Sequence, residues 1–207
     1  MSGQPHRLPT DTDDGMLLII SGPSGVGKTS VTRGVERSIP DAVFSVSATT
    51  RARTEADVEG VDYHFVTDEE FERMKAAGEF LENAGIYGKK YGTPRPWVEE
   101  QLRRGRLVIL EIDVQGAEQV KAKIPEAYSV YILPPDEATL LQRLRDRRRD
   151  DEATIQRRFA QSKSEIARAR VCRVYDQFLV NRDLQDTINQ AVALVNAERQ
   201  GRRARRR

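Results

Sequence analysis

The stretch Gly22-Pro23-Ser24-Gly25-Val26-Gly27-Lys28-Thr29 decides the fold that we expect for this chain. It matches the pattern G-x-x-x-x-G-K-[ST], whose glycines let backbone N–H groups fold around the phosphates of a nucleoside triphosphate. The lysine of this pattern reaches the β- and γ-phosphates, and the hydroxyl of the last residue binds Mg²⁺. We therefore expect residues 22–29 to bind a nucleotide, with Lys28 catalytic and Thr29 as the metal ligand.

The residues on either side have the composition that a phosphate loop requires. Residues 16–21, MLLIIS, form an uninterrupted apolar run, which is typical of a buried parallel strand. Residues 29–38 are expected to form a helix, with Val31 and Val35 on one face. The loop amides and the helix dipole then converge on one anion. The alternative, an ordinary glycine-rich turn, does not require this strand and helix.

Length and composition indicate one soluble domain. A chain of 207 residues with a formal net charge of +2 can build one sizeable core. No apolar run approaches the roughly 20 residues that span a bilayer, and the N-terminus lacks the apolar segment of a signal peptide. The one cysteine, Cys172, cannot form an internal disulfide. We expect a cytoplasmic protein with no membrane contact, in which Cys172 is a structural thiol.

Further strand candidates extend the expected parallel sheet: residues 42–47, 107–112, 128–133 and 178–181. Helical segments separate them, and the last helix carries an apolar stripe that includes Ile188 and Val195. Ligands of such sheets bind beyond the carboxyl ends of the strands. Ser21, Ser47 and Asp113 follow such ends, so we expect them to face one crevice.

Two insertions are expected to interrupt the sheet. Short strands around a helix that begins at Thr67 indicate a small α+β unit. Arginine occupies five of the seven residues 143–149, although a solvated helix face is the usual reason for such a run. The expected domains are a disordered leader (1–15), a core (16–46, 94–135 and 170–200), the α+β insertion (47–93), a helical lid (136–169) and a frayed, solvated basic tail (201–207).

The motifs together resemble those of the guanylate kinase family from residue 16 to about residue 198. The matching segments are GPSGVGKT (22–29), SVSATTR (45–51), GVDYHF (60–65), FLENA (80–84), YGT (91–93), LEIDVQGA (110–117), ILPP (132–135) and LVN (179–181). The resemblance implies an α/β fold with a P-loop parallel-sheet core, helices on both faces, a GMP-binding α+β insertion and an Arg-rich helical lid.

The resemblance also implies a reaction, in which Mg-ATP donates a phosphoryl group to GMP or dGMP to give ADP and GDP or dGDP. Position by position, it assigns contacts with guanine to Ser47, Glu82, Thr93 and Asp113. It assigns the GMP phosphate to Arg51, Tyr63 and Tyr91. Arg51, Arg147 and Arg158 join Lys28 as catalytic residues, with Arg143 as a further lid candidate.

These assignments agree with the chemistry of the side chains. Guanine presents N1–H and N2–H₂ on one edge, and a carboxylate such as that of Glu82 can accept from both. Adenine presents an acceptor at N1, and a site built for hydrogen bonds can reject the wrong group by roughly 10⁴. Arg51 offers a planar fork to phosphate. Without the resemblance, Glu82 is better interpreted as a solvated strand charge, and Tyr63 and Tyr91 as packing residues.

Three departures from the family pattern concern the expected site. Arg53-Thr54 stands where the family usually has Pro-Arg, so the second phosphate-binding arginine is displaced by one residue. Glu111 stands where an aspartate is common, near the expected Mg²⁺ position. Arg148 replaces a lid glycine, which should stiffen a hinge.

Two other functions compete with the kinase. A domain of this family that has lost catalysis could bind a partner protein in the nucleotide crevice, and a related kinase could act on a phosphorylated sugar. The intact Lys28-Thr29 argues against the first, and Glu82 with Asp113 against the second. We expect no specific nucleic-acid partner, although the basic tail leaves salt-sensitive binding open. A homo-oligomer also remains open.

Overall fold

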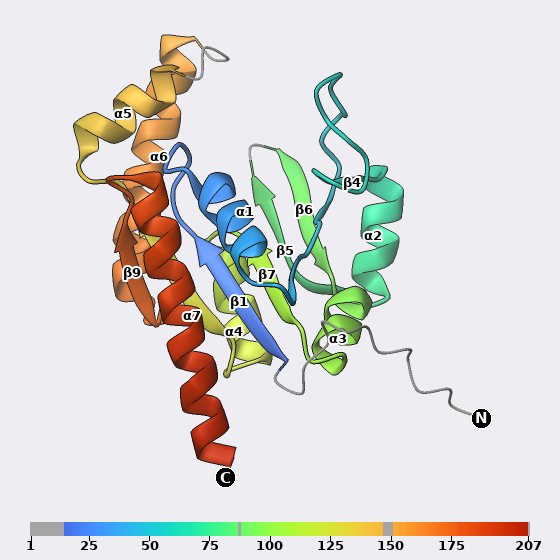
Figure 1. The fold of residues 1–207 in the computed structure, drawn as a ribbon. Coiled ribbons are helices and arrows are strands. Elements are labelled where there is room, and N and C mark those ends of the chain that lie inside the picture. Colours follow the sequence, from blue (N-terminus) through green and yellow to red (C-terminus); the bar gives the residue numbers. More distant parts are fainter. Residues whose placement is uncertain (1–14, 87, 147–150, 207) are drawn as a thin grey trace.

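The computed structural model describes residues 15–86, 88–146 and 151–206 (Figure 1). The chain forms two sheets, and the elements follow in the order β1 (Met16–Ser21), α1 (Lys28–Ser38), β2 (Ala42–Phe44), β3 (Ala48–Thr49), β4 (His64–Phe65), α2 (Asp68–Ala76), β5 (Phe80–Ile86), β6 (Lys89–Pro94), α3 (Arg95–Arg103), β7 (Leu107–Glu111), α4 (Val114–Lys123), β8 (Tyr128–Leu133), α5 (Glu137–Asp146), α6 (Glu152–Val171), β9 (Gln177–Val180) and α7 (Leu184–Arg206).

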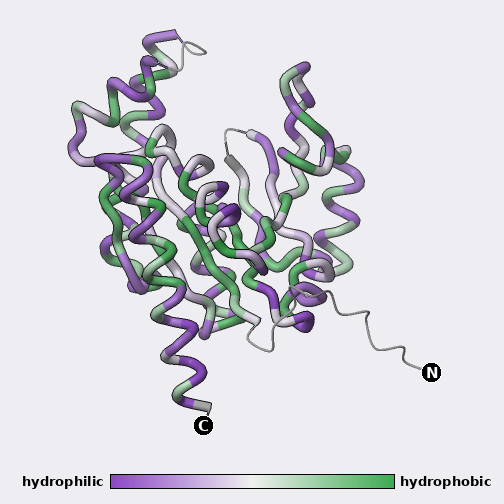
Figure 2. Tube along the Cα trace, in the orientation of Figure 1, coloured by the Kyte–Doolittle hydropathy of each residue, from purple (hydrophilic) through white to green (hydrophobic). Residues whose placement is uncertain are grey.

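The larger sheet has β1 at its centre. Its strand order is β2-β7-β1-β8-β9, and every neighbouring pair is parallel. In the register, Ile19 of β1 lies opposite Leu110 on one side and Ser129 on the other. The apolar runs of β1, β7 and β8 follow from burial on both faces, and Figure 2 shows hydrophobic residues concentrated along the central strands.

Helices cover both faces of this sheet. On one face, Leu18 of β1 packs in a cluster with Val35 of α1 and Val195 of α7. On the other face, Ile19 packs in a cluster with Val98 of α3 and Val120 of α4. The α/β fold with a parallel sheet and helices on both faces, expected from the sequence, is therefore confirmed.

A second, mixed sheet is built from residues that the sequence assigned to the insertion. Its order is β4-β3-β6-β5, with β3 parallel to β4 and the other pairs antiparallel. Helix α2 packs on it through Phe71, whose ring centroid lies 4.6 Å from that of Phe80. The predicted cap of this helix is confirmed, because the Thr67 side chain accepts from Glu70 N–H.

The predicted strand over residues 42–47 was wrong at its end. β2 stops at Phe44, and Ala48 already belongs to β3 of the second sheet. Ser45 N–H still donates to Ile109 O of the first sheet at 2.9 Å, whereas the carbonyl of Ser47 accepts from His64 N–H of the second. The chain thus changes from one sheet to the other between Ser45 and Ser47. The alternation of apolar residues, from which the strand was predicted, does not indicate this change.

Helix α5 and the amino-terminal part of α6 form an arm above the carboxyl ends of the parallel strands (Figure 1), while Ala169 near the other end of α6 packs against the core with Tyr131. They pack on each other through the buried side chains Leu140, Leu144 and Ile155. The predicted lid residues Arg147 and Arg148 lie outside the described residues, as do residues 1–14 of the predicted leader.

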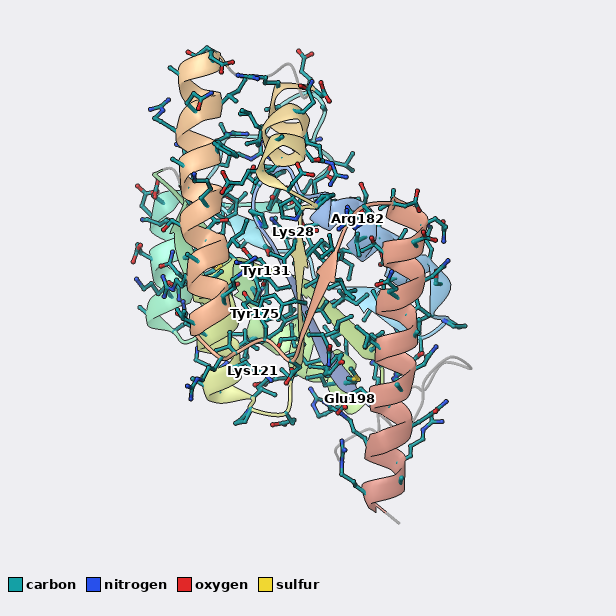
Figure 3. The ribbon with its side chains drawn as sticks, turned by 90° about the vertical axis from the view of Figure 1, so that its left-hand side faces the viewer. Lys28, Lys121, Tyr131, Tyr175, Arg182 and Glu198 are labelled. Atoms are coloured by element: carbon teal, nitrogen blue, oxygen red, sulfur yellow. The ribbon has the colours of Figure 1, made fainter. Side chains whose placement is uncertain are left out.

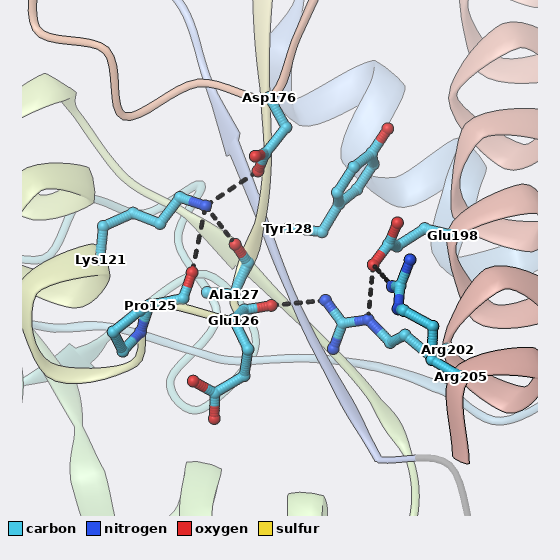
Figure 4. A pocket seen from close by; sticks show the side chains of 9 residues that line it. All are labelled: Lys121, Pro125, Glu126, Ala127, Tyr128, Asp176, Glu198, Arg202 and Arg205. Carbon is cyan, nitrogen blue, oxygen red and sulfur yellow. Dashed lines mark hydrogen bonds and ion pairs between the residues drawn. The ribbon is translucent and has the colours of Figure 1, made fainter. Parts of the chain in front are cut away.

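The predicted frayed tail at residues 201–207 was wrong for its described part, because α7 continues to Arg206. The Arg199 guanidinium forms a buried ion pair with Asp41. One turn later, Arg202 bonds to Glu198 at 2.8 Å and donates to the carbonyl of Glu126 (Figure 4). These contacts attach α7 to the domain as far as Arg202, whereas residues 203–205 are exposed, as expected for a solvated tail. Within the described ranges, none of the helices combines the length and apolar character that crossing a bilayer requires.

Candidate active site

The predicted phosphate loop joins the carboxyl end of β1 to the first residue of α1. Gly27 is the N-cap of α1 with φ of 94°, a left-handed conformation that L side chains rarely adopt. A Cβ at this position would lie 2.8 Å from Nδ2 of Asn181. Glycine is therefore required both by the backbone turn and by the close approach of β9's end.

Two side chains from distant parts of the chain brace this loop. The amide of Asn181, which is buried, donates to Val26 O at 2.8 Å. Arg143 of α5 donates to Asn181 O at 3.0 Å and to Val26 O at 3.4 Å. Arg143 thus supports the loop from behind, a role that the sequence did not predict for it.

Lys28 lies at the upper end of the central strands in Figure 3, below α5. Its ammonium donates to Gly22 O at 2.6 Å and to Pro23 O at 3.3 Å. The lysine therefore folds over its own loop, and reaching a phosphate requires these two carbonyl contacts to be exchanged.

Thr29 and Glu111 together fit the requirements of a magnesium site. The Thr29 hydroxyl donates to Oε1 of Glu111 at 2.8 Å, while Oε2 of Glu111 is buried without a hydrogen-bond partner among the described residues. Mg²⁺ prefers oxygen ligands and is usually held by one or two protein groups together with waters and phosphate oxygens. The glutamate that replaces the family's common aspartate therefore reaches the expected position.

Three of the four residues expected to contact guanine come together where the insertion meets α4. Thr93 of β6 donates to Oε1 of Glu82 at 2.5 Å, and both side chains are buried. Oε2 of Glu82 lies against Gly116, where an added Cβ would approach it to 2.6 Å. Asp113 is the N-cap of α4, and its Oδ1 accepts from Gly116 N–H at 2.8 Å. The two carboxylates thus converge on the first turn of one helix.

Glu82 holds its proton unusually tightly for a glutamate. Burial raises the pKa of Glu82 to about 7, against the lowering effect of the Thr93 hydroxyl, and the nearby charge of Asp113 raises it further. A carboxyl group that is so little exposed and is poised near neutrality is a candidate functional group.

Ser47, the fourth residue, stands beside this pair. It precedes Ala48, which lies opposite Gly92 in the register of β3 and β6, and Gly92 is the neighbour of Thr93. The Ser47 carbonyl accepts from His64 N–H, and its side chain is half-buried.

The residues expected to hold the acceptor phosphate form one cluster in the insertion. The Tyr63 and Tyr91 rings meet edge to face at 5.7 Å, and the guanidinium carbon of Arg51 lies 5.2 Å from the Tyr63 ring centroid. Burial raises the pKa of Tyr63 to about 12, so its hydroxyl is a neutral donor. This cluster combines one cation with phenol donors, which suits an anion.

Asp57 was missed in the sequence, and it occupies the fork of Arg51. The two carboxylate oxygens accept from Arg51 at 2.9 and 2.8 Å, and Oδ2 also accepts from the hydroxyl and N–H of Thr54. These hydrogen bonds lower the pKa of Asp57 well below its usual range, and the bond from Arg51 has the largest effect. The displaced Arg53 instead donates to Asp57 O within the same loop. Only the spacing of six residues to Arg51 hinted at this pair.

The lid supplies a second residue that the sequence did not indicate. Glu165 of α6 accepts from Gln161 at 2.9 Å, and burial raises its pKa, with Lys28 lowering it and Asp113 raising it. A carboxylate of the lid therefore lies within electrostatic reach of both halves of the site. Arg158 lies on the same helix and is half-buried.

A cavity of about 440 Å³ lies away from this site, at the amino end of β8 (Figure 4). The charged residues that line it bond to one another, as Lys121 does to Asp176 at 2.9 Å and Arg205 to Glu198 at 3.2 Å. It shares no residue with the site built around the phosphate loop.

Comparison of the sequence with known proteins points to one family. The guanylate kinase family model matches residues 14–198. This chain belongs to the guanylate kinase family. The guanylate kinase of Anaeromyxobacter dehalogenans is 48% identical over 195 residues, which are 94% of this chain and 83% of that protein. The guanylate kinase of Carboxydothermus hydrogenoformans is 44% identical over 185 residues, 89% of each chain.

Solved structures agree with this membership. The crystal structure of guanylate kinase from Anaplasma phagocytophilum is 33% identical in sequence and has a TM-score of 0.73. The match covers 90% of the chain described here and 87% of the Anaplasma protein. A gluconokinase from Sinorhizobium meliloti, with a TM-score of 0.50 and 13% identity over 92% and 97% of the two chains, shares the fold.

Proposed function

We propose that this protein is a guanylate kinase that transfers the γ-phosphoryl group of Mg-ATP to GMP or dGMP, giving ADP and GDP or dGDP. The observation that carries the proposal is the buried Glu82 carboxylate, bonded to Thr93 and placed against the first turn of α4. A buried carboxyl costs free energy unless a ligand or partner satisfies it. The edge of guanine, with two donor groups, supplies that partner.

Selectivity for guanine follows from the same group. The ionised Glu82 accepts from N1–H and N2–H₂ of guanine, while Asp113 and Ser47 stand beside it as further acceptors. Adenine offers an acceptor at N1, which leaves the buried carboxylate unpaired. Such a mismatch can cost roughly 10⁴ in kcat/KM.

The acceptor phosphate binds at the cluster of Arg51, Tyr63 and Tyr91. Because the second pKa of a phosphate monoester is about 6, its attacking oxygen is already ionised at neutral pH. The reaction therefore needs no general base, and catalysis consists of orientation and stabilisation of charge. Tyrosine hydroxyls donate to the phosphate without adding positive charge, so the attacking oxygen stays nucleophilic.

The donor binds at the phosphate loop, with Lys28 exchanging its carbonyl contacts for phosphate oxygens. Thr29, supported by Glu111, would hold Mg²⁺, and the ion would neutralise charge on the β- and γ-phosphates. Arg147 and Arg158 of the lid complete the cationic surroundings of the transferred group. Closure of the lid over the loop would exclude water, which competes as an acceptor.

The test is formation of ADP from Mg-ATP with GMP, AMP, UMP or no acceptor. The wild type is compared with Lys28→Ala and Glu82→Gln, and with Lys75→Ala and Glu69→Gln as controls on the exposed surface of α2. We expect GMP-dependent turnover that Lys28→Ala abolishes and whose selectivity Glu82→Gln erodes. Tight GMP binding without turnover in the wild type would contradict the proposal and favour a binding domain.

A further inference from the structure

One face of α4 is turned toward β5, the edge strand of the second sheet. Gly116, Gln119 and Lys123 lie three and four residues apart, which places them on one side of the helix. Helix α4 packs directly on β5, the strand that carries Glu82. The same helix begins at Asp113. Both carboxylates of the proposed guanine site therefore depend on how α4 and β5 are joined.

Gln119 pairs with the backbone of β5 as a neighbouring strand would. Its Nε2 donates to Asn83 O at 2.8 Å, and its Oε1 accepts from Asn83 N–H at 3.1 Å. An edge strand presents unpaired N–H and C=O groups that must find partners when they are buried. A primary amide satisfies one donor and one acceptor together, which few other side chains can do.

Lys123 makes a second bond on the other side of Glu82. Its ammonium donates to Leu81 O at 2.5 Å, and the stem reaches this carbonyl from the last turn of α4. The residues before and after Glu82 are thus each attached to the helix by a side chain. On its opposite edge β5 is held by β6, where Glu82 lies opposite Thr93.

We propose that Gln119 and Lys123 are positioning residues that set the selectivity for guanine by holding Glu82 in register with Asp113. Neither side chain needs to touch the nucleotide. The inference rests on the proposed function, because it concerns how that site selects its base. A displacement of about 1 Å at a functional group can lower the reaction rate on the order of 10²-fold. Two backbone attachments that flank Glu82 can therefore affect how well the site selects its base.

The test uses substitutions that keep size and remove the bonds. Gln119→Met removes both bonds to Asn83, Gln119→Glu keeps the acceptor and removes the donor, and Lys123→Met removes the bond to Leu81. Lys123→Arg, which keeps a donor, serves as the rescue. Gln190→Met on α7 and Lys75→Met on α2 are matched controls, because both side chains are exposed and lie on other helices.

The measurements are kcat, KM for GMP and for ATP, and the ratio of kcat/KM for GMP to that for IMP. IMP lacks the exocyclic amino group, so this ratio reports the acceptor edge formed by Glu82. We expect Gln119→Met to raise KM for GMP and to lower the GMP/IMP ratio, each about tenfold, with KM for ATP unchanged. Gln119→Glu should be intermediate, and Lys123→Arg should restore most of what Lys123→Met loses.

Combination with Glu82→Gln separates positioning from general damage. If Gln119 acts through Glu82, Gln119→Met should not change the GMP/IMP ratio further in the Glu82→Gln background. An unchanged ratio in both Gln119→Met and Lys123→Met, or equal losses toward GMP and ATP, would overturn the inference without contradicting the proposed function of the wild type. Absence of GMP-dependent turnover in the wild type would instead refute the proposed function. A thermal melt identifies a variant that fails to fold. If one of the two positions, Gln119 or Lys123, gives such a variant, the variants at the other position decide the test.

Discussion

The hydroxyl of Thr93 donates a 2.5 Å hydrogen bond to Oε1 of Glu82, although the two residues stand on different strands of the inserted sheet. Only 3% of Glu82 and 1% of Thr93 are exposed. This pair keeps a carboxyl group away from water at the point where the insertion meets α4. Burial of this group costs free energy that binding of a partner for the carboxylate can offset, and the first two predictions below depend on this pair.

We predict that Glu82→Gln stabilises the protein at alkaline pH. Burial is the main reason that the pKa of Glu82 is raised from 4.5 to about 7. The unfolding free energy that the neutral form contributes is therefore fully present below pH 4.5 and is lost as the pH rises through 7. This loss amounts to about 3 kcal/mol of unfolding free energy. Glutamine does not titrate. The unfolding free energy of the variant relative to wild type should therefore increase by about that amount between pH 4.5 and pH 8.

Urea unfolding at the two pH values measures this difference. Glu69→Gln, on an exposed position of α2, is measured in parallel as the control. A Glu82→Gln effect of the same size at pH 4.5 and pH 8 would show that the folded protein does not raise this pKa.

We predict that GMP binding releases a proton from Glu82 near neutral pH. Because the pKa of Glu82 is raised to about 7, a substantial fraction of this side chain is protonated at neutral pH, whereas only the ionised form accepts both donors of guanine. Binding should therefore release about half a proton per GMP at pH 7, and apparent affinity should rise between pH 6 and pH 8. Calorimetry in two buffers of different ionisation enthalpy measures the release. Glu82→Gln should remove most of it and leave the small release from the GMP phosphate, whose second pKa is about 6; an undiminished release in this variant would assign the proton to another group.

We predict that Asp57→Asn weakens GMP binding. Asp57 holds the Arg51 fork with two bonds and fastens Thr54, so it orients the guanidinium before the phosphate arrives. Without this charge-assisted support the guanidinium is less well oriented, so KM for GMP should rise roughly tenfold while KM for ATP stays constant. Glu55→Gln, exposed in the same loop, is the control. A lower KM in Asp57→Asn would mean that the carboxylate competes with phosphate for Arg51.

We predict that Glu111→Gln raises the Mg²⁺ concentration needed for half-maximal activity by roughly tenfold, because the amide removes a negative charge from a site for a divalent cation. The amide still accepts from Thr29, whose bond to Glu111 is 2.8 Å long. Binding of ADP in the presence of EDTA should remain unchanged, which separates metal binding from nucleotide binding. Glu99→Gln, exposed on α3, is the control, and a Mg²⁺ titration identical to wild type would remove Glu111 from the metal site.

We predict that Arg147→Ala lowers kcat roughly 10²-fold, the usual loss when one donor to the transition state is removed, with little change in KM for either nucleotide. Arg145→Ala is the matched control from the same arginine run, since Arg145 is bonded to Glu152 at 2.7 Å. Single-turnover rates with both nucleotides saturating measure the chemical step. An unchanged kcat would exclude Arg147 from the mechanism, and Arg158→Ala would then be the next variant to measure.

The features that the sequence determined by itself are those encoded by neighbouring residues. Residues 22–29 specify a phosphate loop because glycine spacing and the Lys28-Thr29 pair are local properties of the backbone. The apolar run 16–21 indicates a central strand for the same reason, and Thr67 marks the start of α2 through a bond to a residue only three positions away. The order of the motifs was sufficient to identify the family.

The tertiary structure decided the features that depend on contacts between distant residues. The pKa of Glu82 depends on burial beneath α4, and the bonds of Gln119 to Asn83 join positions 36 residues apart. The ion pair between Arg199 and Asp41, 158 residues apart, attaches α7 to the domain just before the basic run. Composition records which charges a chain carries. Only the fold determines which of them lose water and which partner each one finds.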